Sequence, residues 1–420
     1  MKQLLSKKVF IIIFIIFLVS RLFVLANPPY SKKKGGYSDV KHDYERYANI
    51  WWYGLPPYLK HLFEYPPATI PLIIFPLFLD QKGIGKFYPN YRFQIFVIDL
   101  LFFFCLVKFL KKIKIEKIQK LTALAFYIIS GLIAKDFLYD GIDFIFSSVF
   151  VLILIIFFLL DQKKTLNRLL FWIMFWLSVG IKLITFPLLF IFSLVKLKSL
   201  KRELITLIVG FLIVWGLPLI IFRSSLLVIF VYNFSRSFKY SSFPYLIADS
   251  INAFTKTELK IDLAPDFSLT GPYSVIILSI FNKLLPLCVV LTILYSLYLF
   301  LKYKKRNDFL LLLKMSLIYV LVFYLSSKIY SQPFPIWLIP LGSIALFYNK
   351  KRQIIFYLLI CFLLIIDTTN LLNLREFGYK IFIYPLNFNF LRGVIKFLVI
   401  TALLILSLKI PIENRKLANH

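Results

Sequence analysis

The run VFIIIFIIFLVSRLFVLA, residues 9–26, is long and apolar enough to span the hydrocarbon core of a bilayer as a helix. Lys2, Lys7 and Lys8 precede it and make its leading end basic. A secretory signal peptide begins in the same way, but no A-x-A cleavage pattern follows the apolar run. The sequence therefore predicts an uncleaved first transmembrane helix with its basic end inside.

Apolar runs recur along the whole chain of 420 residues. Hydrophobic residues make up 60% of it and charged residues 17%, and the mean hydropathy is +0.82. This composition excludes a soluble enzyme, a disordered protein and a secreted disulfide scaffold. It predicts an all-α, polytopic integral membrane protein with about 11 to 13 transmembrane helices. After the first run, the others lie near 68–79, 93–110, 121–134, 144–160, 169–195, 204–222, 275–301, 309–327, 336–348, 354–372 and 391–408.

The formal net charge of +30 comes from 50 Lys and Arg residues against 20 Asp and Glu. No basic stretch sits on a soluble module, so we expect no nucleic-acid partner. Cations gather in the cytoplasmic loops of membrane proteins, and the basic clusters between the apolar runs place both termini in the cytoplasm. The result is a single transmembrane domain over residues 1–420. Its predicted outer loops are 27–66, 135–143, 223–274, 328–335 and 373–390.

Two regions do not fit one helix per crossing. Residues 66–110 hold two apolar runs but make one net crossing, so one run is short or re-entrant. Residues 169–195 must cross twice or fold as a hairpin, with Lys182 near the tip. Asp99 lies inside an apolar run, where we expect it to pair with a neighbouring helix. Most acidic residues fall in the predicted outer loops, and one candidate cause of this asymmetry is a reaction centre facing outward.

The first outer loop carries the most information. Residues 40–53 have aromatic side chains at helical spacing, which predicts an amphipathic helix on the membrane surface. Asp39 comes just before this helix, where a carboxylate either caps the helix or faces a site above the bilayer. Glu64 has two interpretations as well, since it can orient an acceptor hydroxyl or pair with a loop lysine. Lys182 lies between two apolar half-helices, where an ionised side chain is costly and usually functional, although it can also extend to the outer interface.

The loop also carries a series of short motifs in a fixed order. These motifs resemble those of the polytopic GT-C glycosyltransferases, most closely the mannosyltransferase branch that uses polyprenyl-phosphate mannose and is typified by glycosyltransferase family 87. Family members show an Asp in the first outer loop, a Tyr/Ala-bearing amphipathic helix, a Gly before Pro-Tyr, and a Tyr-Pro-Pro that opens the next membrane segment. The matching residues are Asp39, Tyr47-Ala48, Gly54, Pro57-Tyr58 and Glu64-Tyr65-Pro66-Pro67.

Three further motifs extend the resemblance over roughly residues 1–345. YDGIDFIFS, residues 139–147, resembles the outer turn in which an Asp opens a helix, here Asp143. GIKLITFP, residues 180–187, resembles the K-x-x-x-x-P hairpin. KIYSQPFPIWLIP, residues 328–340, resembles a late segment with Lys, Gln and Trp-Leu-x-Pro.

The resemblance implies transfer of a hexose, mannose in the first place, from a polyprenyl-phosphate donor to a glycolipid, glycan or protein acceptor. Transfer would invert the anomeric carbon on the outer or lumenal face of the membrane. Asp39 is the expected catalytic base, with Asp43 as a rival because the spacing to Tyr47 is one residue longer than usual. Lys182, Lys328 and Arg236 are expected to bind the donor phosphate. The expected acceptor or sugar contacts are Glu64, Tyr65, Asp143 and Gln332, and Asp143 can instead cap its helix.

Two other classes of function stay open at this point. A carrier or flippase for a lipid-linked sugar would show polar residues near the midplane of several helices and often internal repeats, neither of which we detect. A polymerase or ligase of lipid-linked glycans would perform a related task on a different acceptor. We expect no cofactor. His42 and His61 share the loop with Asp39, and a divalent metal is left open although their spacing matches no known ligand set.

Overall fold

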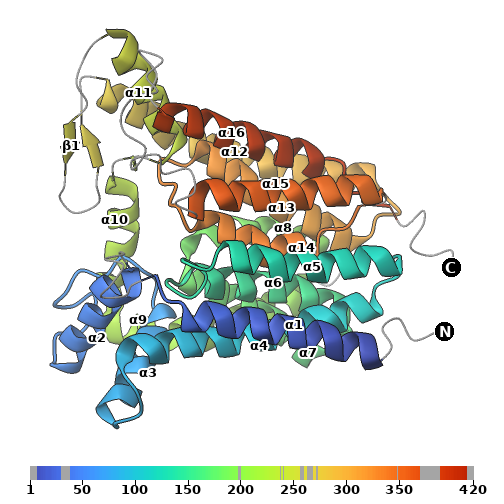
Figure 1. The fold of residues 1–420 in the computed structure, drawn as a ribbon, viewed down its shortest axis with the longest axis horizontal. Helices are drawn as coiled ribbons and strands as arrows, with labels where there is room; N and C mark the ends of the chain where they lie inside the picture. Colours follow the sequence, from blue (N-terminus) through green and yellow to red (C-terminus); the bar gives the residue numbers. More distant parts are fainter. Residues whose placement is uncertain are drawn as a thin grey trace. The chain divides into compact units, whose positions relative to one another are not determined.

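Helices make up nearly all of the regular structure in the computed structural model (Figure 1). The one exception among the described residues is a small antiparallel sheet of β1 (Lys260–Asp262) and β2 (Ser268–Thr270). The predicted helical fold class is confirmed at this level. The structure describes residues 7–29, 38–196, 200–236, 238–239, 241–255, 260–262, 268–270, 273–347, 349–368 and 388–413. Most of the predicted outer loop 373–390, parts of loops 27–66 and 223–274, and both chain ends lie outside these ranges.

The chain divides into two compact units. The described residues of unit 1 lie within 7–233 and 336–344, and those of unit 2 lie within 234–335 and 345–413. The helices of unit 1 are α1 (Lys7–Ala26), η1 (Val40–Tyr44), α2 (Glu45–Trp52), α3 (Thr69–Gln81), α4 (Phe87–Lys112), α5 (Lys117–Ile133), α6 (Asp143–Leu159), α7 (Thr165–Ile181), η2 (Leu183–Thr185), α8 (Leu188–Val195), α9 (Leu200–Phe222), η4 (Arg223–Leu227) and α14 (Leu338–Ser343).

Unit 1 is built on helix-to-helix packing. The helix α4 packs on α1, α3 and α6, and α7 packs on α6 and α9 (Figure 1). The short α14 returns from much later in the chain and packs on α5 and α6. Large aromatic side chains fill the interior, and Trp172, Phe17 and Tyr127 are fully buried. This packing fixes the helix ends that carry the candidate site.

Both ambiguous regions of the sequence are resolved within unit 1. Of the two apolar runs in 66–110, α3 is the short one, with 13 residues, while α4 has 26. In 169–195, α7 ends at Ile181 and the eight-residue α8 follows. The ring centroid of Phe192 in α8 lies 5.7 Å from that of Phe175 in α7, so the two helices form the predicted hairpin. Lys182 lies at its tip, with extended backbone torsions of φ −144° and ψ 128°.

Unit 2 is organised around α13. It contains α11 (Phe243–Thr255), the β1–β2 hairpin, α12 (Ser274–Lys302), α13 (Asp308–Ser326), α15 (Lys350–Thr368) and α16 (Phe388–Ser407). Two short helices run across the division between the units: α10 (Val228–Ser235) and η5 (Phe334–Trp337). The helix α13 packs on α12 and α16, and 83% of its most apolar stretch is buried, against 17% for α12. The helix α13 is therefore the core of this unit, and α12 keeps most of its apolar surface outside.

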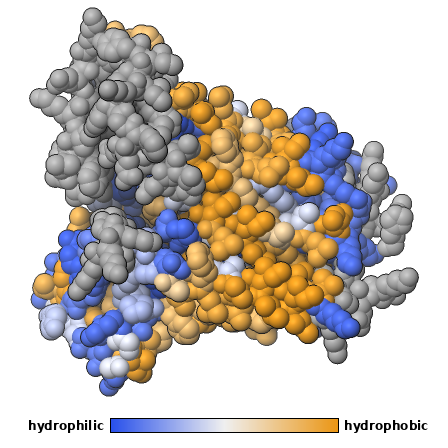
Figure 2. Space-filling view, in the orientation of Figure 1, coloured by the Kyte–Doolittle hydropathy of each residue, from blue (hydrophilic) through white to orange (hydrophobic). Residues whose placement is uncertain are grey.

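Five described helical segments are long and apolar enough to cross a membrane. They are Lys8–Ala26, Phe87–Lys112, Lys201–Ser235, Ser274–Lys302 and Asp308–Ser326. Figure 2 shows hydrophobic side chains over α1 and α4, and more hydrophilic ones over α2. Large apolar side chains are exposed on α1, with Val19 at 62%, and on α9, with Ile220 at 73%. In water such surface would be unfavourable, so the chain is a helical membrane protein with lipid against these faces.

Candidate functional site

The helix over residues 40–53 is capped by Ser38 and not by Asp39, for which the sequence left open either a capping role or a place in a site. The Ser38 hydroxyl oxygen accepts a hydrogen bond from the Lys41 backbone N–H at 3.4 Å, the spacing of a helix cap. Asp39 already has helical torsions, φ −55° and ψ −36°, and its side chain makes no capping bond. The capping role that the sequence left open for Asp39 therefore belongs to Ser38. Asp39 itself is half-buried.

The predicted amphipathic helix over residues 40–53 is present as the π-helical turn η1 followed by α2. Its inner face buries Tyr44, Tyr47 and Trp51, while Trp52 and Tyr53 are exposed. Aromatic residues with this placement suit the membrane interface. On the outer side Asp43 pairs with Arg46 at 3.4 Å. Asp43 is thus a partly solvated helix acid.

Three tyrosines hold the end of this loop. The Tyr47 hydroxyl donates to Glu64 Oε2 at 3.3 Å, and the Tyr58 hydroxyl donates to the Tyr65 carbonyl at 2.5 Å. The hydroxyl of Tyr44 lies 3.4 Å from that of Tyr65, and their rings meet edge to face. Glu64 therefore bonds to an aromatic hydroxyl of α2.

Carboxylates from three parts of unit 1 act electrostatically on the Tyr65 hydroxyl. Burial raises the pKa of this hydroxyl well above its usual range, and Glu64, Asp39 and then Asp143 raise it further. A phenol with such neighbours stays protonated and can donate to them or to a bound group. Tyr65 therefore presents a neutral hydroxyl beside that of Tyr44, 3.4 Å away.

Asp143 and Lys182 form the second part of the site. The helix α6 begins at Asp143, with Ile142 at the cap position. Asp143 Oδ1 accepts from Lys182 Nζ at 2.5 Å and from the Trp337 indole N–H at 2.5 Å. The Lys182 ammonium also lies over the Trp337 ring, 4.8 Å from its centroid. The side chains of Lys182 and Asp143 keep 16% and 8% of their surface exposed.

Sequence reasoning quoted Trp337 within a motif but gave it no role. Its partner Asp143 is 194 residues away in the chain, and Trp337 is only 2% exposed. An indole N–H that is buried needs an acceptor, and a carboxylate is a strong one. The signal in the sequence that could have identified Trp337 is the late Trp-Leu-x-Pro motif.

Asp140 is a second residue that the sequence did not assign. Its carboxylate is buried and forms an ion pair with Arg92 of α4. Asp140 Oδ1 also accepts from the hydroxyls of Ser38 and Tyr88, each at 2.7 Å. Arg92 donates in addition to the Val24 carbonyl at 2.6 Å. Asp140 and Arg92 together thus join α1, α4 and the loop at Ser38.

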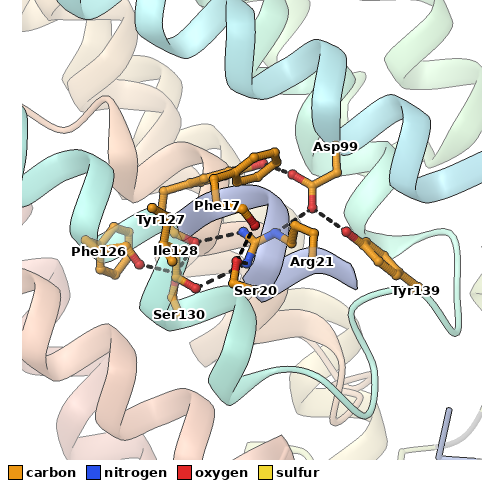
Figure 3. Close-up of polar contacts among 9 residues, drawn as sticks. All are labelled: Phe17, Ser20, Arg21, Asp99, Phe126, Tyr127, Ile128, Ser130 and Tyr139. Atoms are coloured by element: carbon orange, nitrogen blue, oxygen red, sulfur yellow. Dashed lines mark hydrogen bonds and ion pairs between the residues drawn. The ribbon is translucent and has the colours of Figure 1, made fainter. Parts of the chain in front are cut away.

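Deeper in unit 1, Asp99 confirms the prediction that it pairs with a neighbouring helix. Asp99 Oδ2 lies 2.8 Å from Arg21 Nε of α1, and the hydroxyls of Tyr127 and Tyr139 both donate to Asp99 (Figure 3). The Arg21 guanidinium also donates to the Tyr127 and Ile128 carbonyls of α5. A buried pair bonded in this way is structural, because each charge is satisfied by fixed partners.

The other predicted site residues lie in unit 2. Lys328 Nζ donates to the Phe234 carbonyl at 2.7 Å. Burial, and then the nearby Arg236, lower the pKa of Lys328. Gln332 is half-buried in the turn that follows Tyr330. The structure therefore brings Lys328 and Arg236 together in one unit, and Asp39, Glu64, Tyr65, Asp143 and Lys182 together in the other.

Among the residues that the structure describes, no group of three or more His, Cys, Asp or Glu side chains is placed to hold a metal ion. His42 Nδ1 instead lies 2.9 Å from the Ser38 carbonyl oxygen. No protein-family model matches the chain, and no curated protein matches it. The fold defines a helical membrane protein in which Lys182, at the tip of the α7–α8 hairpin, pairs with Asp143 in the unit that also contains Asp39, Glu64 and Tyr65.

Proposed function

We propose that this protein is a GT-C-type membrane glycosyltransferase. It takes a hexose, mannose in the first place, from polyprenyl phosphate and passes it with inversion to an acceptor on the outer or lumenal face. The observation that supports the proposal is the Lys182 ammonium at the tip of the α7–α8 hairpin, held 2.5 Å from Asp143 in the same unit as Asp39 and Glu64. The reaction needs a carboxylate to take the acceptor proton and a cation to stabilise the leaving phosphate, and unit 1 contains both kinds of group.

Asp39 is the proposed base. The acceptor hydroxyl attacks the anomeric carbon and loses its proton to the Asp39 carboxylate as the new glycosidic bond forms. Asp43 is a weaker candidate, because it already pairs with Arg46 on the exposed side of the helix. Glu64, Tyr65 and Gln332 are proposed to contact the acceptor or sugar.

Lys182 is proposed to stabilise the leaving group. The bond between the anomeric carbon and the phosphate oxygen breaks, and its electron pair leaves with the polyprenyl phosphate. This dianionic product needs a nearby cation, and no acid has to protonate it. Asp143 and Trp337 hold the ammonium in place, so little reorganisation is needed when the phosphate arrives. Lys328 and Arg236 are the further candidates for phosphate binding.

The proposal also includes how the donor reaches the site and how the chain is oriented in the membrane. A lipid-linked donor reaches the site within the bilayer, and the described chain has no nucleotide-binding α/β domain that a soluble donor would use. Both termini would be cytoplasmic, and about 11 to 13 helices would cross or enter the membrane.

The test uses purified protein in lipid vesicles, radiolabelled polyprenyl-phosphate mannose and a mixed glycolipid acceptor pool. We expect transfer by the wild type, a loss of at least about 100-fold in Asp39→Asn, and near-normal transfer in Asp43→Asn. The two variants remove one carboxylate each from the same short helix, so Asp43→Asn is the matched control. Loss only in Asp43→Asn would move the base. Labelled lipid that crosses the bilayer without sugar transfer would identify a carrier instead.

A further inference from the structure

Residues 139–143 tie three separate clusters together. Tyr139 donates to Asp99 at 2.7 Å, Asp140 binds Arg92, Tyr88 and Ser38, and Asp143 binds Lys182 and Trp337. Tyr139 and Asp140 have at most 5% of their surface exposed, and Asp143 has 6%. A segment whose side chains are bonded in this way has little freedom to move. Groups bonded to it share one rigid frame.

Ser38 links this frame to the candidate base. Its hydroxyl donates to Asp140 Oδ1 at 2.7 Å, and it is only 2% exposed. Its carbonyl accepts the His42 N–H at 3.0 Å, which starts the helix at this point. Asp39 is the next residue and its torsions are helical, so the direction of its side chain from the backbone follows from the position of Ser38. Ser38 is 102 residues from Asp140 in the chain.

We propose that Asp140 is a positioning residue that holds Asp39, through Ser38, in a fixed place relative to the Asp143–Lys182 pair. The catalytic consequence of this positioning rests on the proposed function. Proton transfer to Asp39 and charge stabilisation by Lys182 act on opposite sides of the same reacting carbon. Their relative placement therefore matters, and errors near 1 Å cost about 100-fold in rate.

Direct removal of Asp140 is a poor test, because it leaves Arg92 buried without its counter-charge and threatens folding. Ser38→Ala and Tyr88→Phe are better, since each removes one hydroxyl that lies 2.7 Å from the same oxygen of Asp140. Ser38 adjoins Asp39 in the chain, whereas Tyr88 belongs to α4. We expect similar losses of thermal stability in both variants, but a fall in kcat of about 10- to 100-fold, at unchanged donor KM, in Ser38→Ala alone.

Two further variants separate positioning from helix capping. Ser38→Thr keeps the hydroxyl and should restore most of kcat. Ser38→Asp keeps a capping acceptor but turns a carboxylate toward Asp140, and it should lose at least as much kcat as Ser38→Ala. Full activity in Ser38→Asp, or equal kcat losses in Ser38→Ala and Tyr88→Phe, would overturn the proposal.

A second readout does not depend on sugar transfer. The variant Asp39→Cys is alkylated with a membrane-impermeant maleimide, alone and in combination with Ser38→Ala or Tyr88→Phe. The labelling of the matching proteins that keep Asp39 is subtracted. We expect the alkylation rate to change at least about fivefold when Ser38→Ala is added and to stay unchanged when Tyr88→Phe is added.

The alkylation rates separate this proposal from the proposed reaction. Equal rates in all three proteins would refute positioning of residue 39 by the bond between Ser38 and Asp140. A changed rate in a protein whose wild type transfers no sugar would sink the proposed reaction but leave residue 39 positioned by Asp140.

Discussion

Arg21 shows what a single charge needs inside this protein. The residue lies in an apolar helix and is 0% exposed, yet its guanidinium has an acceptor at each nitrogen. The close approach of α5 is possible because residue 131 has no side chain. A Cβ on Gly131 would lie 2.4 Å from Arg21 Nη1 and 2.5 Å from Arg21 Cζ. The glycine is therefore part of the charge site.

Gly131→Ala should destabilise the protein by about 1 to 3 kcal/mol. The guanidinium would have to shift, and the shift would lengthen its bonds to Asp99 and to the α5 carbonyls. Thermal unfolding in detergent measures the effect. Gly216→Ala is the control, because its nearest neighbour would be 4.0 Å away and alanine is the better helix former. Equal melting temperatures in the two variants would contradict this account.

Individual partners were the hardest part to predict from the sequence. An aspartate within an apolar run must find a partner, so pairing of Asp99 was predictable. That the partner is Arg21 depends on how α1 and α4 pack, which the sequence separation of 78 residues does not reveal. Ser38 as the cap was missed because Asp39, its neighbour, is an equally good capping residue by type.

At the scale of elements, the end of α7 that leads into Lys182 is held against the start of α3. Two residues before it, the Gly180 carbonyl accepts the Ala68 N–H at 2.9 Å. This bond joins the end of α7 to the start of α3. A Cβ on Gly180 would lie 2.8 Å from Ala68 Cβ, which is too close for both to be present. The space where α3 and α7 cross therefore holds one methyl group and not two.

The crossing predicts a size exchange. Gly180→Ala should push α3 away from α7 and lower both thermal stability and sugar transfer, the latter by about 10-fold or more. Ala68→Gly in the same protein removes the opposing methyl and should restore most of both. Measurement of the two single variants and the double variant completes the cycle. Additive losses in the double variant would show that the two residues do not meet.

Local patterns carried the element predictions. The aromatic spacing of residues 40–53 and the apolar halves around Lys182 are both visible over short stretches of the chain, so the sequence was enough to find them. The seating of α14 on α5 and α6 was not visible, because Trp337 meets Asp143 from 194 residues away. Long-range contacts of this kind are set by packing rather than by local periodicity.

At the scale of the molecule, both units present exposed apolar helices to lipid around a covered core. In unit 1 the helices α1 and α9 expose apolar side chains, and in unit 2 the helix α12 does so while it covers α13 together with α16. The proposed sides of the membrane follow from the charges, which leave the basic turn after α6 inside and the first loop outside.

This orientation can be measured in intact cells. Tyr53→Cys, at a position that is 78% exposed in the first loop, should react with a membrane-impermeant maleimide added outside. Lys163→Cys, in the exposed turn before α7, should react only after the membrane is permeabilised. The wild type supplies the background from Cys105, Cys288 and Cys361, which are half-buried. Outside labelling of Lys163→Cys and not of Tyr53→Cys would invert the proposed topology.

The Arg21–Asp99 pair also constrains how the protein is made. The ribosome delivers α1 long before α4, so Arg21 enters the membrane machinery 78 residues ahead of its counter-charge. Until α4 and α5 emerge, the first helix carries an uncompensated cation that hydrocarbon disfavours. We therefore expect slower release of α1 into lipid until the later helices emerge, and slower release from a nascent chain cut before Asp99 than from one that includes α4 and α5. The same pair that secures the finished protein would then also influence the order of its assembly.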